Sequence, residues 1–160
     1  MVKVYRVDDR LIHGQVQTSW IKEYSINRII IIDDGVCNDE ITKRILKVAK
    51  PAQTDLVICG TDRAVSLLEK DAAQQKARTL VIFKTIKTAS EIVKQGWKVE
   101  ELIIGPTSNK ESTVQVAKNT YFTQCEIDAL RYLVETGTNV VSQLLPSEPR
   151  VSLASKINDK

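Results

Sequence analysis

The sequence contains few of the residues that many kinds of site require. Its 160 residues include one histidine, three cysteines and only 5% aromatic residues. No apolar run approaches the ~18 residues that a membrane-spanning helix needs, and the N-terminus has no apolar stretch typical of a signal peptide. The cysteines, Cys37, Cys59 and Cys125, are far apart and form no Cys-x-x-Cys pair. We therefore expect reduced thiols in a cytoplasmic protein.

The charge pattern gives no indication of a nucleic-acid partner. Lysine and arginine total 23 against 20 acidic residues, for a formal net charge of +3, and the two signs are interleaved along the chain. Nucleic-acid binding usually requires a clustered basic face with stacking aromatic residues. The chain also lacks a G-x-G-x-x-G segment and a P-loop, so a nucleotide-binding domain is not indicated.

The chain instead shows apolar strand-like runs that alternate with helical patterns. Strands are predicted over 2–8, 27–33, 54–60, 78–84, 99–105 and 139–145, with one more near 113–118. Helices are predicted over 14–25, 38–50 and 61–72, from a Thr88–Glu91 capping box to Gly96, and from a Thr123–Glu126 capping box to about Gly137. Residues 146–160 are predicted to form a surface tail.

This alternation predicts an α/β fold. We expect a single three-layer α/β/α domain over residues 1–160, with a mostly parallel central sheet of about six or seven strands. Ligands of such sheets bind beyond the carboxyl ends of the strands. The segments that follow the predicted strands are 8–13, 33–34, Gly60, 84–85 and Gly105. We expect these polar and small groups to share one edge of the sheet.

The only histidine lies in one of these segments, "DDRLIHGQV". His13 directly precedes a predicted helix, whose free N–H groups and dipole attract anions. Arg10 offers a planar group of donors that suits phosphate, and either Asp8 or Asp9 could accept the other ring N–H. The segment therefore suits transfer of a phosphoryl group through a nucleophilic imidazole.

Each of these residues also has an ordinary structural interpretation. His13 could be a loop histidine bonded to backbone, and "DDG" at 33–35 could be a turn with side-chain-to-backbone bonds. Lys84 could be a solvated lysine, and Cys37 has no evident base and is predicted to be inert.

The segment "VDDRLIHGQV" resembles the IIB component of the mannose-fructose-sorbose family of the bacterial phosphotransferase system. Further matches follow in order over essentially the whole chain: "NDEI" at 38–41, "FKT" at 83–85, "AKNTYFT" at 117–123 and "VVSQLLPSEPRVSL" at 140–153.

The resemblance implies a cytoplasmic phosphocarrier associated peripherally with membrane transporter subunits. His13 would accept phosphate from a phosphorylated IIA domain and pass it to a sugar that enters through membrane subunits IIC and IID. Arg10 would steady the phosphate, and Asp9 belongs to the same loop. The less specific pocket positions are Gly14, Gln15, Asp33, Asp34, Lys84 and Thr85. The resemblance implies no metal and no cofactor, and a homo-oligomer is possible.

Two segments depart from the family pattern. Gly105 is followed by Pro106 where the family often has paired glycines, and the proline removes a backbone donor. The stretch "DDGVCNDE" also places its Asn-Asp pair further from the second strand than is common.

Other functions remain to be weighed against the carrier. A binding or regulatory module of the same fold could use the same loop to grip an anion without chemistry. A histidine phosphatase needs a second histidine in its site, and this chain has only one.

Overall fold

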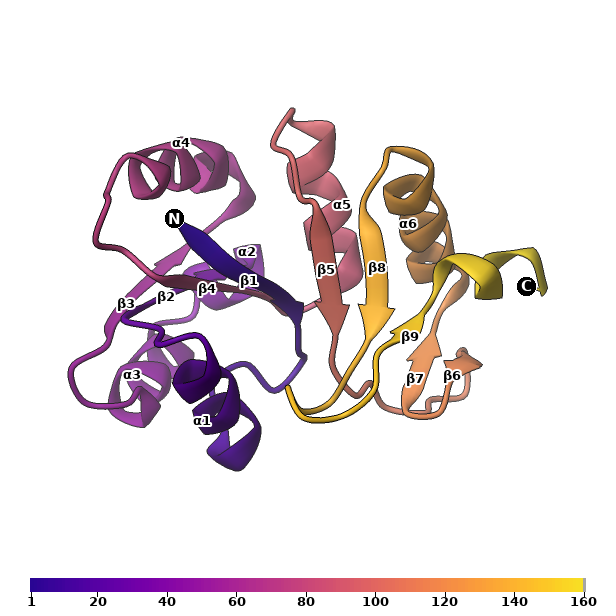
Figure 1. The fold of residues 1–160 in the computed structure, drawn as a ribbon, viewed down its shortest axis with the longest axis horizontal. Coiled ribbons are helices and arrows are strands. Elements are labelled where there is room, and N and C mark those ends of the chain that lie inside the picture. Colours follow the sequence, from indigo (N-terminus) through magenta and orange to yellow (C-terminus); the bar gives the residue numbers. More distant parts are fainter. Residues whose placement is uncertain (160) are drawn as a thin grey trace.

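The computed structural model describes residues 1–159, and for residues 15–17, 158 and 159 it describes the backbone alone. Seven strands form one sheet in the order β3-β2-β4-β1-β5-β8-β9, and two further strands form a separate hairpin (Figure 1). The sheet strands are β1 (Val2–Val7), β2 (Arg28–Ile32), β3 (Asp55–Cys59), β4 (Thr79–Phe83), β5 (Glu101–Ile104), β8 (Asn139–Ser142) and β9 (Val151–Ser152). The hairpin pairs β6 (Val114–Ala117) with β7 (Thr120–Phe122).

The predicted α/β fold with a mostly parallel sheet is confirmed. All sheet pairs are parallel except β8 with β9, which is antiparallel. The helices are α1 (Gly14–Glu23), α2 (Asp34–Cys37), α3 (Glu40–Ala49), α4 (Thr61–Ala72), α5 (Ile86–Lys94), α6 (Gln124–Glu135) and a terminal 3₁₀ helix η1 (Ala154–Asp159). Among the described residues, no helix is long and apolar enough to cross a bilayer.

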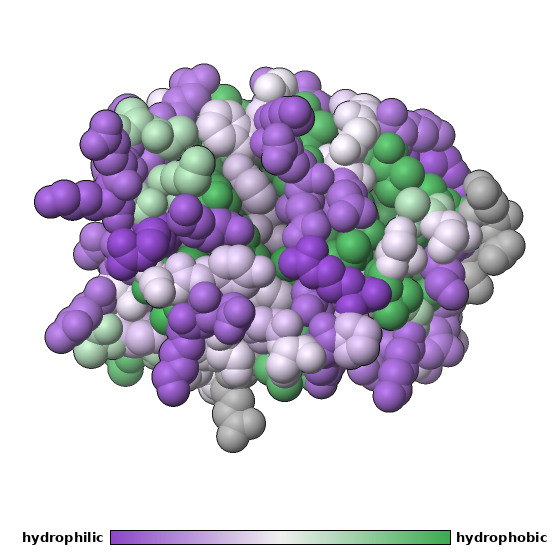
Figure 2. All heavy atoms as spheres, viewed as in Figure 1, coloured by the Kyte–Doolittle hydropathy of each residue, from purple (hydrophilic) through white to green (hydrophobic). Residues whose placement is uncertain are grey.

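Helices cover both faces of the sheet. Because side chains alternate along a strand, each strand contributes to two cores: Ile29 and Ile31 pack with Trp20 and Leu46 of α1 and α3, while Ile30 lies in the core beneath α4, α5 and α6. The continuous apolar run in β2 is fully buried, as expected for a parallel strand covered on both sides. Figure 2 shows the molecular surface from the same side as Figure 1. Hydrophilic side chains cover most of this surface, with smaller apolar areas among them.

The start of α5 differs from the sequence prediction. Thr85, and not Thr88, is the N-cap, and its hydroxyl accepts the backbone N–H of Thr88. The helix therefore starts at Ile86, which is fully buried, about one turn earlier than the Thr88–Glu91 pattern indicates. The second predicted capping box, Thr123 with Glu126, is confirmed at the start of α6.

The sequence predicted a surface tail over residues 146–160, and this prediction is wrong. Val151 and Ser152 pair with β8 as an added antiparallel strand, and Leu153 and Ile157 are buried in the core with α6. The predicted strand over 139–145 is correspondingly shorter, because the chain leaves β8 at Ser142 and turns back toward β9.

Candidate active site

The predicted loop segments all lie at the carboxyl edge of the parallel sheet. The strand order places the end of β1 between the ends of β4 and β5, near the middle of that edge. Asp8 continues β1 by donating its N–H to the carbonyl of Phe83 at 3.0 Å, and its own carbonyl accepts the N–H of Leu11 at 3.1 Å. Leu11 adopts a left-handed φ of 58° and is buried together with Ile12. Burial of these two side chains anchors the loop and fixes the direction in which the next residue, His13, leaves it.

His13 contacts Asp8 directly. His13 Nε2 lies 2.8 Å from Asp8 Oδ2, and Asp8 Oδ1 accepts the backbone N–H of Arg10 at 3.1 Å. The Asp8 side chain is 3% exposed and the imidazole 19%. Because a carboxylate only accepts hydrogen bonds, this contact places the proton of the neutral ring on Nε2 and its lone pair on Nδ1. The sequence did not decide whether Asp8 or Asp9 accepts the ring N–H of His13. In the structure the acceptor is Asp8.

A buried arginine, Arg6, lies beside Asp8 and was not among the residues predicted from the sequence. Arg6 Nε lies 3.7 Å from Asp8 Oδ2, with the Arg6 side chain only 3% exposed. The guanidinium donates to the carbonyls of Gln143 at 2.9 Å and Leu144 at 3.2 Å, and it lies 5.0 Å from the centre of the Trp20 ring. Burial lowers the pKa of Arg6 to about 10 against the opposing attraction of Asp8. The sequence feature that could have indicated this pair is the spacing of Arg6 and Asp8, because residues two positions apart on a strand point to the same face.

Gly105 makes room for this arginine. A Cβ at Gly105 would lie 2.8 Å from an Arg6 guanidinium nitrogen and 3.0 Å from the Val7 carbonyl oxygen. The Gly105 N–H donates to that same carbonyl at 2.8 Å. The loop that departs from the family pattern, Gly105-Pro106, therefore keeps a backbone bond and a close approach that only glycine allows.

Arg10 and the start of α1 provide cationic and N–H groups beside the imidazole. The Arg10 side chain is about half exposed, and its Nε lies 3.8 Å from Asp8 Oδ1. His13 is the N-cap of α1 and its side chain makes no capping bond, while Gly14 opens the helix with a φ of 23°. The Gln15 side chain lies outside the described part of the structure, and Asp9 is partly exposed in the same loop.

The remaining predicted positions lie at the same edge but in a different group. Asp33 caps α2 by accepting the Val36 N–H at 2.9 Å, and Asp34 accepts the Thr61 N–H at 2.8 Å. The predicted "DDG" turn is thus a short helix whose acids bond to backbone. Together with Thr85, both acids line an open cavity of about 580 Å³ that does not include His13.

Lys84 is exposed and, within the described part of the chain, has no hydrogen bond or ion pair to the His13 loop. Its charge contributes to the lowered pKa of Asp39, after the hydrogen bonds that Asp39 accepts from Thr42. The structure therefore does not bring Lys84 into contact with His13 among the described interactions.

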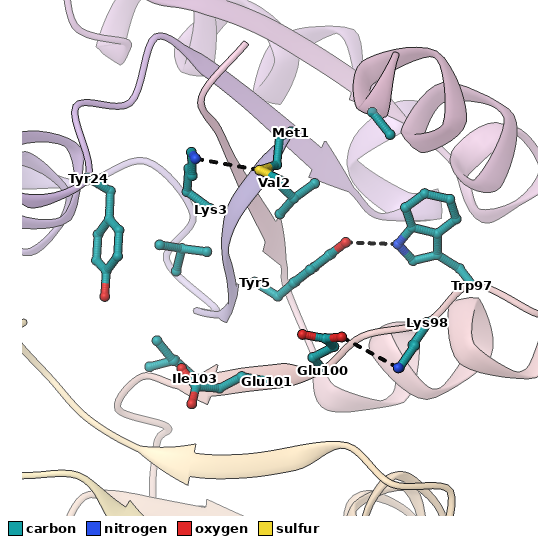
Figure 3. Close-up of a pocket in the computed structure, with 12 residues that line it drawn as sticks. Met1, Val2, Lys3, Tyr5, Tyr24, Trp97, Lys98, Glu100, Glu101 and Ile103 are labelled. Carbon is teal, nitrogen blue, oxygen red and sulfur yellow. Dashed lines mark hydrogen bonds and ion pairs between the residues drawn. The ribbon is translucent and has the colours of Figure 1, made fainter. Parts of the chain in front are cut away.

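A second cavity, of about 450 Å³, lies at the opposite, amino edge of the sheet (Figure 3). Its walls include the start of β1, Tyr24 and Trp97, and the Trp97 indole donates to the Tyr5 hydroxyl at 2.8 Å. Since β1 runs from this cavity to the His13 loop, the two lie at opposite ends of the strand.

Comparison with known proteins identifies the class. Residues 2–160 match the model of the family described as "PTS system sorbose subfamily IIB component", so the chain belongs to this family of phosphotransferase system components. The family-level resemblance inferred from "VDDRLIHGQV" is therefore confirmed. The chain is a phosphotransferase that acts as a phosphocarrier in sugar uptake.

Individual relatives agree with the family match. The chain is 30% identical over 159 residues to the sorbose-specific EIIB component of Lacticaseibacillus casei, covering 99% of this chain and 96% of the relative. The crystal structure of the IIBSor domain of the Klebsiella pneumoniae sorbose permease superposes with a TM-score of 0.90 at 30% identity, covering 100% and 98% of the two chains. The mannose-specific EIIAB component of Escherichia coli is 27% identical over 160 residues, which are 99% of this chain and 49% of that protein. Components of this kind work with IIA and membrane components of the same system.

Proposed function

We propose that His13 is the residue that carries the phosphoryl group, and that the attacking atom is Nδ1. The observation that supports this most is the 2.8 Å contact between His13 Nε2 and the buried Asp8 carboxylate, which leaves the lone pair of the neutral ring on Nδ1. The ring is also partly exposed, at the carboxyl edge of the sheet where ligands of this fold class bind. A donor can therefore approach it.

In the first transfer, the phosphoryl group moves from the donor to His13. A bond forms between Nδ1 and phosphorus, while the bond from phosphorus to the donor nitrogen breaks and its electron pair stays with the donor. His13 becomes an imidazolium, which the Asp8 carboxylate stabilises across Nε2–H. Arg10 and the first backbone N–H groups of α1 bind the phosphoryl oxygens.

The second transfer returns the electron pair to Nδ1. A sugar hydroxyl oxygen bonds to phosphorus as the Nδ1–P bond breaks, and the hydroxyl proton passes to water or to a base beside the sugar. Asp9 has no contact with the ring in this scheme, and its proposed role is to shape the loop. Gly14 and Gln15 belong to the helix start that faces the phosphate.

The proposed donor is a phosphorylated IIA domain, and the proposed acceptor is a sugar held by membrane subunits IIC and IID. The name of the mannose-specific EIIAB relative, which joins the two components in one chain, supports a close A–B partnership. We propose that Asp33, Asp34, Lys84 and Thr85 form part of the docking face beside the site. We also propose a single domain over residues 1–160 that works in the cytoplasm beside its membrane subunits, in keeping with the family match over residues 2–160.

The test is to map the phosphate. The protein is incubated with a phosphorylated IIA domain and, separately, with phosphoramidate, a small donor that needs no docking. Peptide mass mapping should find one acid-labile phosphate on the His13 peptide from both donors, and none in His13→Ala. A label that persists in His13→Ala would contradict the assignment. Reversible phosphate binding without a covalent label would instead indicate an anion-binding module.

A further inference from the structure

We propose that Arg6 is a positioning residue for the transfer: by holding Asp8 it fixes the tautomer and orientation of His13, and it joins this pair to the loop between β8 and β9. The proposal rests on the proposed role of His13 as phosphocarrier. Arg6 itself touches neither the donor nor the acceptor.

Arg6 occupies a strand position that an apolar residue would fill at lower cost. Val4 before it on the same face of β1 is buried in the core with Trp20 and Ile29. A buried guanidinium must replace its hydration with hydrogen bonds, and an apolar residue of similar size is often more stabilising at such a position. Arg6 meets this need through two backbone carbonyls, the Asp8 carboxylate and the Trp20 ring. The benefit is therefore to be sought in what the guanidinium does for Asp8.

The charge on Arg6 balances the site. Arg6 and Asp8 together are neutral, so a phosphoryl group approaching His13 does not face an uncompensated carboxylate. Arg6 Nε and His13 Nε2 both approach the same Asp8 oxygen, Oδ2, at 3.7 and 2.8 Å. Attraction toward Arg6 keeps Oδ2 turned to the imidazole, while the Arg10 N–H holds Oδ1. Without Arg6 the carboxylate loses the buried cation beside Oδ2.

Arg6 also connects His13 to a second loop. The Leu144 carbonyl accepts from Arg6 and, at 3.0 Å, from the indole N–H of Trp20, a residue of the helix that His13 caps. In Figure 1 the chain between β8 and β9 extends toward the carboxyl end of β1, in agreement with these bonds. The β8–β9 loop, Trp20 of α1 and Asp8 of the His13 loop therefore all contact one guanidinium.

Gly105 supplies independent support for this arrangement. A side chain there would approach the Arg6 guanidinium to 2.8 Å, so Gly105→Ala displaces Arg6 without altering its charge. The substitution therefore tests the position of Arg6 separately from its chemistry.

The experiment uses the single imidazole as a spectroscopic probe. With ¹⁵N-labelled histidine, the ring-nitrogen chemical shifts report the tautomer of His13 with no other histidine to interfere. The spectrum is recorded at a pH where the ring is neutral for the parent protein, Arg6→Met, Arg6→Lys and Gly105→Ala. The matched control is Arg28→Met, because Arg28 at the start of β2 forms another arginine–aspartate pair, with the buried Asp71 of α4 at 3.4 Å, at the opposite edge of the sheet from His13. The kcat and KM for phosphate transfer from phosphorylated IIA are measured alongside.

We expect the parent protein and Arg28→Met to show the Nε2–H tautomer and equal kcat. Arg6→Met should show both tautomers and a kcat lowered about tenfold or more with KM little changed. Arg6→Lys should fall between them, and Gly105→Ala should shift toward Arg6→Met. The proposal is overturned if folded Arg6→Met or Gly105→Ala keeps a single Nε2–H tautomer at full rate, or if Arg28→Met lowers kcat equally. The tautomer is read without any phosphate donor, so failure of the His13 assignment would be seen separately in the phosphate mapping.

Discussion

At the level of single residues, Arg10 and Asp8 lie in different environments, which suit the separate roles proposed for them. Asp8 is buried and faces Nε2, whereas Arg10 is about half exposed and makes only a 3.8 Å ion pair with Asp8. Its donors are thus available to an incoming anion. Arginine can bind two phosphoryl oxygens at once from a planar group, and lysine offers a single compact charge.

We therefore expect Arg10→Lys to slow transfer while leaving the fold intact. A charge-assisted hydrogen bond contributes about 1.5–3 kcal/mol, so the rate should fall about ten- to a hundredfold. The measurement is the rate of phosphate passage from IIA to His13, with the melting temperature recorded in parallel. A full rate would show that Arg10 does not grip the phosphate through two bonds, and a slow rate with a lowered melting temperature would show a structural role.

The residues of the site were only partly predictable. The segment 8–13 was found because its charges and single histidine follow a strand. The choice between Asp8 and Asp9 was not available from sequence, because it depends on where the pleat of β1 ends and how Leu11 turns the chain. Arg6 was hidden for a similar reason: its partners Gln143 and Leu144 are 137 and 138 residues away.

At the scale of elements, the start of α5 distinguishes two capping schemes. The sequence favours Thr88, whereas the structure makes Thr85 the N-cap. We expect Thr85→Ala to lower the free energy of unfolding by about 1 kcal/mol, and Thr88→Ala to have a smaller effect. Urea denaturation of both variants decides between them, and a larger loss in Thr88→Ala would restore the sequence-based assignment.

The C-terminal strand and 3₁₀ helix give a second test at this scale. Leu153 is fully buried against the core, while Val151, two residues earlier, is 44% exposed. Truncating a buried leucine to alanine usually costs about 2–5 kcal/mol, and an exposed substitution stays within about 0.5 kcal/mol. Leu153→Ala should therefore destabilise the protein strongly in urea and Val151→Ala should not. Equal small effects would show that this segment is a loose tail after all.

The elements themselves were largely predictable, and their partners were not. Runs such as "RIIII" indicate a strand buried on both faces wherever it lies in the sheet. By contrast, β9 has only two residues and forms by pairing with the edge of β8. No local sequence pattern therefore predicts it. The position of β1 between β4 and β5 is likewise a property of the whole sheet.

At the scale of the whole molecule, the three free thiols report on folding. Cys125 is exposed and Cys59 is buried, and burial, the largest cause, raises the pKa of Cys59 to about 11 from 9.0. The folded state therefore holds this proton more tightly than the unfolded state does. This contribution to stability is fully present below pH 9 and is lost as the pH rises through about 11.

We expect stability to fall by about 2 kcal/mol over this range through Cys59 alone. The measurement compares the urea midpoints of the parent protein and Cys59→Ala at pH 8 and at about pH 10.5. The parent should lose more than the variant, and an equal loss would assign the decline to other groups. In the native protein, an alkylating reagent should modify Cys125 first and Cys59 only on unfolding.

We expect His13 to carry phosphate on Nδ1 while Nε2 stays bonded to Asp8. The most direct measurement is the NMR spectrum of the phosphorylated protein labelled with ¹⁵N-histidine, in which coupling to ³¹P identifies the phosphorylated nitrogen of the only imidazole. We predict coupling at Nδ1, with Nε2 still protonated. Coupling at Nε2 would mean that the Asp8 contact breaks on phosphorylation, and it would contradict the account.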